Sequence, residues 1–183
     1  GNTEGLIYPN WTKIPDSAFP WDDERIIMGL DFGYTIDPTA GALVLIDGVK
    51  IFCHELFYET GLSSQEIVSI PRESPLNSYD YDLVKNETKV YCDHDPDMIS
   101  QLQRLQVNAV MGLKSVAAGI QALQKYKVYY TASSHNIAHE ITRYEWDENK
   151  VTGSFINKPR PNRPDHILDA IRYAAYTHKY MPT

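Results

Sequence analysis

The order of strand-like and helix-like segments is the feature that most constrains the fold. Three apolar, strand-like runs follow one another at residues 26–32, 40–47 and 49–57, and Asp47-Gly48 between the last two is a two-residue hairpin signal. After them, helix-like and strand-like segments alternate. Consecutive strands tend to pair antiparallel and strands separated by helices pair parallel, so we predict an α/β fold with a mixed central sheet and helices on both faces.

Turn residues and helical spacing predict the remaining elements. We expect helices at 61–69, 95–105, 115–124, 134–144 and 165–180, and further strands at 89–92, 108–111 and 127–131. We expect Ser63 or Ser64 to cap the first helix, with Glu66 in the capping box, and Ser134 and Asp165 to cap the last two. Residues 71–88 fit no single pattern, and the polar stretch 146–163 is a loop or a hairpin.

Length and composition indicate one domain. The chain has 183 residues, 43% of them hydrophobic, which suffices for one well-buried core. Residues 1–24 contain three prolines without periodicity, so we expect a linker or lead-in there and a domain over 25–183. No apolar run reaches membrane-spanning length. Cys53 and Cys92 lie in strand-like runs, which favours reduced core thiols and a cytoplasmic location.

Two strand-like runs end in a carboxylate. Asp31 ends the first, and Asp93 ends the run at 89–92. A charge at the end of a buried strand costs several kcal/mol unless it is paired or bound to a metal ion. We therefore expect both to be catalytic metal ligands. The alternative for Asp31 is that it caps a turn through Gly33. Asp37, six residues after Asp31, is equally well explained as a turn residue or as an accessory metal ligand.

The last predicted helix adds a third acidic position. His166 and Asp169 are three residues apart and so lie on one helical face. We expect Asp169 as a metal ligand and His166 as a second ligand or proton shuttle; Asp165 is either the helix cap or a further ligand. The alternative makes Asp169 a surface partner of Arg172 or Tyr173. Converging carboxylates bind Mg²⁺ or Mn²⁺, the ions of two-metal phosphodiester cleavage.

Charge and the remaining motifs exclude several classes. The net charge of −7 argues mildly against nucleic-acid binding, but a basic cluster free of acidic residues lies just before the last helix. The members of this cluster are Lys150, Lys158, Arg160 and Arg163. They and Lys114, which lies elsewhere in the sequence, are our candidates for phosphate contacts. His135 and His139 have helical zinc spacing without the glutamate of a zinc peptidase, and the chain contains no Walker-type loop.

At these residues the chain resembles the C-terminal nuclease domain of the large terminase subunit of tailed phages and prophages, in its PBSX-type branch. The resemblance covers about residues 26–178. Its matching stretches are Gly29–Tyr34 with Asp37-Pro38, Val90–Asp93, Lys114-Ser115 with Gly119–Val128, Ser134–Asn136 with Glu140 and Tyr144–Trp146, and Asp165–Tyr173.

The resemblance implies an RNase H-like fold and an Mg²⁺- or Mn²⁺-dependent endonuclease. Two divalent cations would be held by Asp31, Asp93 and Asp169, with His166 beside them and Asp165 left open. The substrate would be concatemeric double-stranded viral DNA, cut during genome packaging in the host cytoplasm. The implied partners are the terminase ATPase domain, the small terminase subunit and the portal of the procapsid.

Three other readings stay open. Another RNase H-like nuclease, such as a Holliday-junction resolvase, would share the carboxylates and prefer branched DNA. The stretch Leu30–Thr35 also resembles the first phosphate loop of actin-like ATPases, although the chain is about half the length that these need and lacks their second loop. The third reading is an inert DNA-interaction domain on the same scaffold.

Overall fold

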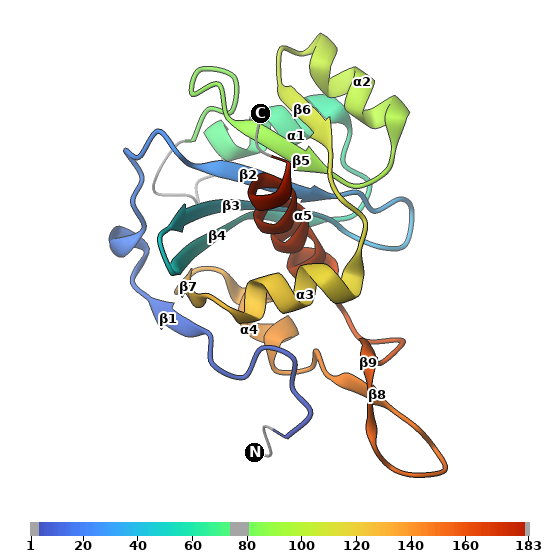
Figure 1. The fold of residues 1–183 in the computed structure, drawn as a ribbon. Helices are drawn as coiled ribbons and strands as arrows, with labels where there is room; N and C mark the ends of the chain where they lie inside the picture. Colours follow the sequence, from blue (N-terminus) through green and yellow to red (C-terminus); the bar gives the residue numbers. More distant parts are fainter. Residues whose placement is uncertain (1–3, 74–80, 182–183) are drawn as a thin grey trace.

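A seven-stranded mixed sheet forms the centre of the molecule, with strand order β1-β7-β4-β3-β2-β5-β6 (Figure 1). The structure is a computed structural model and describes residues 4–73 and 81–181. The strands are β1 Thr12–Ile14, β2 Ile27–Asp31, β3 Thr39–Asp47, β4 Lys50–Glu59, β5 Lys89–Cys92, β6 Asn108–Met111 and β7 Lys127–Thr131. A separate hairpin consists of β8 Trp146–Glu148 and β9 Phe155–Pro159.

Strand direction places the ends of β2 and β5 together. The strands β2, β3 and β4 pair antiparallel, whereas β5, β6, β7 and β1 each join the sheet in parallel pairs. Every strand of this sheet except β3 therefore runs in the same direction, and their carboxyl ends meet at one edge of the sheet. The prediction of three antiparallel strands followed by parallel strands is confirmed.

Helices cover both faces of the sheet (Figure 1). They are α1 Ser64–Glu73, α2 Pro96–Arg104, α3 Val116–Gln124, α4 His135–Ile141 and α5 His166–Tyr180. On one face α5 packs against β2 and β3, with α3 and α4 beside it; α1 and α2 contact each other on the opposite face. This is the predicted three-layer architecture. None of the described helices is long and apolar enough to cross a membrane.

A glycine lets α5 approach the central strand. A Cβ atom built on Gly29 of β2 would lie 1.7 Å from the carbonyl oxygen of Ala170 in α5. Any larger residue would push the helix off the sheet. Because Gly29 is two residues before Asp31, and Ala170 follows Asp169, this close packing brings the two acidic positions to the same edge.

Some local signals are confirmed and others are wrong. Ser63 and Glu66 form the expected capping box, since each side chain accepts from the other residue's backbone N–H at 3.2 Å. Asp95 caps α2 by accepting from the Met98 N–H. However, neither Ser134 nor Asp165 makes a capping hydrogen bond at its helix. Carboxylates from other elements perform that function, as described below.

The amino-terminal segment belongs to the sheet in part. Thr12–Ile14 forms β1, which pairs parallel with β7, and Ile7, Tyr8 and Phe19 are buried in the core. The sequence analysis did not predict β1, because pairing with β7 stabilises a segment that has no periodicity of its own. That this segment links to another domain stays a prediction. Of the unassigned stretch 71–88, residues 71–73 extend α1, and part of the rest lies outside the described residues.

Candidate metal centre

Asp31 and Asp93 lie side by side at the carboxyl edge of the sheet. The parallel register sets Leu30 of β2 against Cys92 of β5, and the Asp93 N–H donates to the Leu30 carbonyl at 2.9 Å. Asp31 is buried and Asp93 is half-buried. One oxygen of Asp93 accepts from the Tyr173 hydroxyl at 3.0 Å and from the His94 N–H at 2.7 Å. Tyr173 of α5 thus orients this carboxylate.

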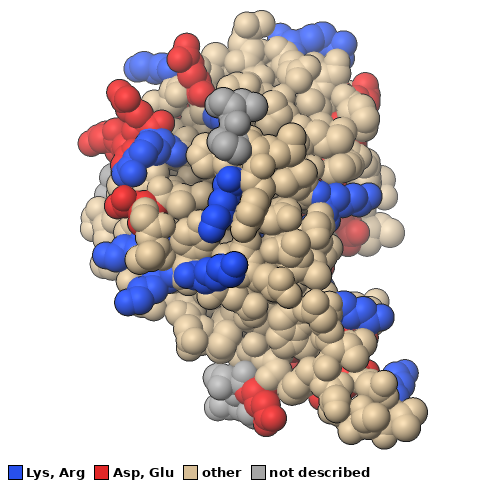
Figure 2. Space-filling view, in the orientation of Figure 1, with Lys and Arg blue, Asp and Glu red and all other residues tan. Residues whose placement is uncertain are grey.

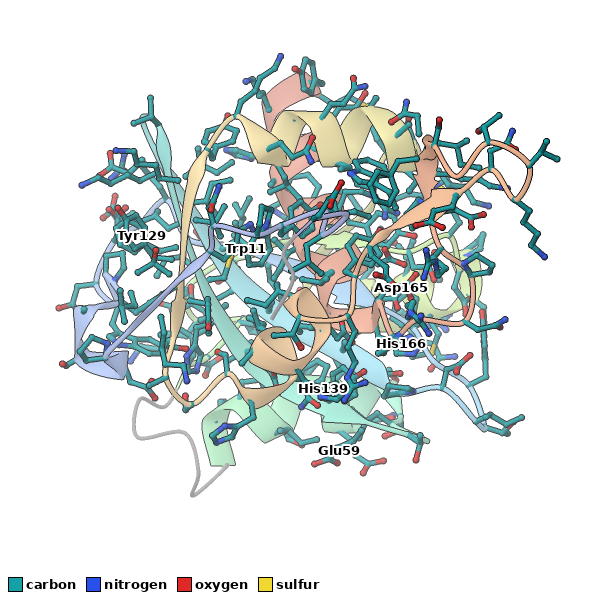
Figure 3. The ribbon with its side chains drawn as sticks, turned by 90° about the horizontal axis from the view of Figure 1, so that it is seen from below. Trp11, Glu59, Tyr129, His139, Asp165 and His166 are labelled. Atoms are coloured by element: carbon teal, nitrogen blue, oxygen red, sulfur yellow. The ribbon has the colours of Figure 1, made fainter. Side chains whose placement is uncertain are left out.

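The start of α5 brings His166 to Asp31. The imidazole Nδ1 is 3.7 Å from Asp31 Oδ2, and Nε2 is 3.9 Å from Asp37 Oδ1. Asp165 and His166 lie next to each other at the beginning of the helix (Figure 3). Asp37 is exposed, in the loop between β2 and β3. His166 therefore lies between a buried and an exposed carboxylate, where it can hold or transfer a proton.

Asp169 is paired with a buried arginine. Arg172 Nη1 donates to Asp169 Oδ1 at 2.7 Å, and Arg172 is only 3% exposed. The sequence allowed this pair as a surface contact; in the structure Arg172 is buried and Asp169 is half-buried. The guanidinium Nε is buried and has no hydrogen-bond partner among the described residues. Arg172 thus partly neutralises Asp169, which is itself half-buried.

Burial and neighbouring charges shift the pKa values of Asp31, Asp165, Asp169 and His166. Burial raises the pKa of Asp31 to about 6, and the negative charges of Asp93 and Asp165 add to this, whereas His166 opposes it. Burial also raises the pKa of Asp165 and Asp169. In turn the Asp31 carboxylate raises the pKa of His166 to about 9, against the effect of burial. The acidic side chains at this edge outnumber the neighbouring cations Arg172 and His166.

The donor set fits a hard divalent cation in chemical type. The four acidic groups at the edge offer carboxylate oxygens, the ligands that Mg²⁺ and Mn²⁺ prefer. A cation would also relieve the repulsion that helps to raise the pKa values of Asp31, Asp165 and Asp169. Within residues 4–73 and 81–181, no three Asp, Glu, His or Cys side chains already stand at the spacing of a formed metal site.

The sequence analysis missed Glu140 as a functional residue. This glutamate of α4 is fully buried and accepts hydrogen bonds from the first three N–H groups of α5 and from the Tyr58 hydroxyl. Burial raises its pKa to about 7, and the Tyr58 hydrogen bond opposes that effect. The sequence did contain a signal for this role. Glu140 shares the apolar face of α4 with Ile137 and Ile141, which predicts that its carboxylate is buried, and a buried carboxylate requires hydrogen-bond partners.

The basic cluster is largely paired with acidic residues of β8 and its flank. Arg160 and Arg163 contact Glu145 at 2.9 and 3.0 Å, and Lys158 lies 3.8 Å from Asp147. Sequence distance concealed this pairing, because the hairpin folds 155–163 back onto 145–148. The protruding hairpin accordingly carries both blue and red side chains in Figure 2.

Two of the lysines predicted to contact phosphate are Lys114 and Lys150. Both are exposed, and neither forms an ion pair with a described carboxylate. Lys114 follows a loop tied to the acidic edge: the Gly112 N–H donates to the Cys92 carbonyl at 2.7 Å, and the Leu113 N–H donates to Thr177 of α5 at 2.8 Å. On the face shown in Figure 2, lysines and arginines are spread over a mainly uncharged surface.

Comparison with solved structures identifies the fold. The large terminase (g2p) nuclease domain of bacteriophage SPP1, with bound Mn, superposes with a TM-score of 0.72 at 21% identity over 93% of this chain and 96% of that one. The chain has the fold of a large-terminase nuclease domain. The large terminase of a thermophilic bacteriophage, in complex with ADP, gives a TM-score of 0.71 at 24% identity over 96% of this chain and 45% of that one.

A third similar structure, the large terminase nuclease from thermophilic phage G20c with bound magnesium, gives a TM-score of 0.57 at 17% identity over 82% of this chain and 80% of that one. No family model matches the sequence, and no curated protein matches it. The RNase H-like terminase fold predicted from the sequence is thus confirmed by the structure alone. The chain spans about half the length of the ADP-bound large terminase and nearly all of the SPP1 nuclease domain.

Proposed function

We propose that this chain is the metal-dependent endonuclease domain of a phage or prophage large terminase, which cuts concatemeric double-stranded DNA during genome packaging. The observation that carries the proposal is the acidic edge itself. Asp31 and Asp93 end neighbouring parallel strands, and α5 sets His166 beside Asp31. The fold is that of terminase nucleases, two of which are described with bound Mn or magnesium.

The acidic residues would hold two divalent cations, Mg²⁺ or Mn²⁺. Asp31 is the central ligand in this proposal, since it lies between Asp93 and the start of α5, and Asp169 and Asp165 would complete the set. Bound ions would supply an activated water and stabilise the leaving oxygen. Tyr173 would keep Asp93 oriented, and His166 would hold or transfer a proton next to Asp31.

Exposed basic residues would position the DNA. Lys114 follows β6, whose carboxyl end lies at the same edge of the sheet as those of β2 and β5, and Lys150 lies in the β8–β9 turn. Both would contact phosphates without reading sequence. Lys158, Arg160 and Arg163 would join them by exchanging their carboxylate partners for phosphate. The further proposed partners are the terminase ATPase domain, the small terminase subunit and the procapsid portal, and the proposed location is the host cytoplasm.

Plasmid cleavage tests the proposal directly. Supercoiled DNA is incubated with the wild type, Asp31→Asn or Asp22→Asn in Mn²⁺, Mg²⁺ or EDTA. Asp22 is an exposed carboxylate in the segment before β2 and serves as the matched control. We expect metal-dependent nicking and linearisation by the wild type and Asp22→Asn only. Cleavage retained by Asp31→Asn would contradict the site, and a preference for four-way junctions over linear duplex would favour a resolvase instead.

A further inference from the structure

Glu140 makes an unusually complete set of contacts for a buried carboxylate. Its Oε1 accepts from the N–H groups of Ile167 and Leu168, both at 3.1 Å. Its Oε2 accepts from the His166 N–H at 3.1 Å and from the Tyr58 hydroxyl at 2.7 Å. Glu140 itself has no exposed surface. All four bonds end on this enclosed carboxylate, where competition with water is weak.

These contacts place Glu140 at the start of α5. The first N–H groups of a helix have no partner within the helix and carry its positive dipole end, so a carboxylate there is favourable. Asp165, the residue expected to fill this role, makes no capping bond. The first turn of α5, which carries His166 and Asp169, is therefore held by a residue from another helix.

The same arrangement fixes α4, from which Glu140 extends. Glu55 of β4 accepts from the N–H groups of Asn136 and Ile137 at 3.0 and 3.1 Å and from the Asn136 amide at 2.7 Å. Three residues further along β4, Tyr58 donates to Glu140. Glu55 bonds to α4 alone, and the buried Ile137 and Ile141 also hold α4 in the core. Of the two glutamates, Glu140 is the one that bonds to α5.

We propose that Glu140 is a positioning residue of the nuclease, a role that rests on the function proposed above. It sets the height and rotation of the first turn of α5, and so the distances from His166 and Asp169 to Asp31. Glu140 itself is separated from the reacting atoms by the α5 backbone. Residues that orient metal ligands typically contribute 10- to 100-fold to metal affinity or activity.

The test compares Glu140→Gln with Glu55→Gln. The amide keeps the size of the side chain but replaces one accepting oxygen with an NH₂ group, which cannot accept from a helix N–H. Both positions are carboxylates that cap a helix from another element, but only Glu140 contacts the helix of the site. Both variants are assayed at a temperature where circular dichroism shows them fully folded.

We expect Glu140→Gln to lower kcat for plasmid cleavage 10- to 100-fold and to weaken Mn²⁺ binding, measured by calorimetry, at least 10-fold. We expect unchanged affinity for duplex DNA in EDTA. In the metal-free protein the amides of Ile167 and Leu168 exchange with solvent faster. Glu55→Gln is expected to lose less than about 3-fold in either quantity.

Equal losses in the two variants would overturn the positioning role, because a general loss of stability would affect both alike. So would unchanged kcat and Mn²⁺ affinity in Glu140→Gln. Either outcome leaves the nuclease intact, since wild-type cleavage and its loss in Asp31→Asn report on that separately. A wild type that does not cleave but binds Mn²⁺ still decides the role through affinity. A wild type that does neither would overturn both proposals.

Discussion

Asp31→Asn should make the metal-free protein more stable while it abolishes cleavage. Asp31 is 8% exposed, and burial raises its pKa from 3.8 to about 6, so its ionised form is poorly accommodated in the folded state. Asparagine has nearly the same shape without the charge. A pKa difference of this size corresponds to about 3 kcal/mol, and hence to a rise in Tm of roughly 6–12 °C for a domain of this length.

The pH dependence follows from the direction of the shift. The folded protein binds the Asp31 proton more tightly than the unfolded chain does. The resulting stabilisation is fully present below pH 3.8 and is lost as the pH rises through about 6. Asparagine does not titrate, so the advantage of the variant should be near zero at about pH 4 and complete at about pH 8.

Urea denaturation in EDTA at these two pH values measures the difference, with Asp22→Asn as the exposed control. A gain that appears only at the higher pH would support the burial argument. A variant that is no more stable than the wild type at about pH 8, or whose gain is equal at both pH values, would refute it. Stabilisation coupled to lost activity is the usual mark of a functional site that is strained in its resting state.

Three further predictions concern single contacts. Gly29→Ala should cost about 3 kcal/mol or more in urea denaturation, because the new methyl group meets the Ala170 carbonyl; a loss below about 1 kcal/mol would mean that α5 can shift freely. Tyr173→Phe should lower the cleavage rate about 10-fold and the free energy of unfolding by about 1 kcal/mol, because Asp93 loses the hydroxyl that orients it. Cleavage as fast as that of the wild type would show that Asp93 needs no such partner. Arg172→Met should destabilise by about 3 kcal/mol at neutral pH, since it leaves the half-buried Asp169 without its cation. Arg172→Met with Asp169→Asn should recover most of that loss.

Contacts set by strand order could be predicted from the sequence. Asp31 and Asp93 each end an apolar run, and parallel pairing of those runs was sufficient to predict that they meet. His166 lies three residues before Asp169, so helical geometry likewise predicts that the two side chains share one face of α5. These relations depend on a few neighbouring residues and on general rules of sheet topology.

Contacts between distant elements could not be predicted in the same way. Asp165 is an ordinary choice of helix cap, but Glu140, 25 residues earlier, is the residue that fills that role. Arg160 and Arg163 follow a stretch without acidic residues, yet the hairpin folds them onto Glu145. In each case a local propensity competed with a tertiary contact, and the tertiary contact won because it also satisfied a buried or half-buried charge.

The acidic edge shows why the fold needs such long-range partners. Four carboxylates held close together repel one another, and Arg172 and His166 lower this repulsion. Repulsion alone would drive the first turn of α5 away from β2. Two contacts oppose it from within the fold: the close packing of Ala170 on Gly29, and the hydrogen bonds from the α5 backbone to Glu140. Both act through backbone atoms of α5, so they hold the helix in place while leaving the carboxylate oxygens of the edge available for a cation.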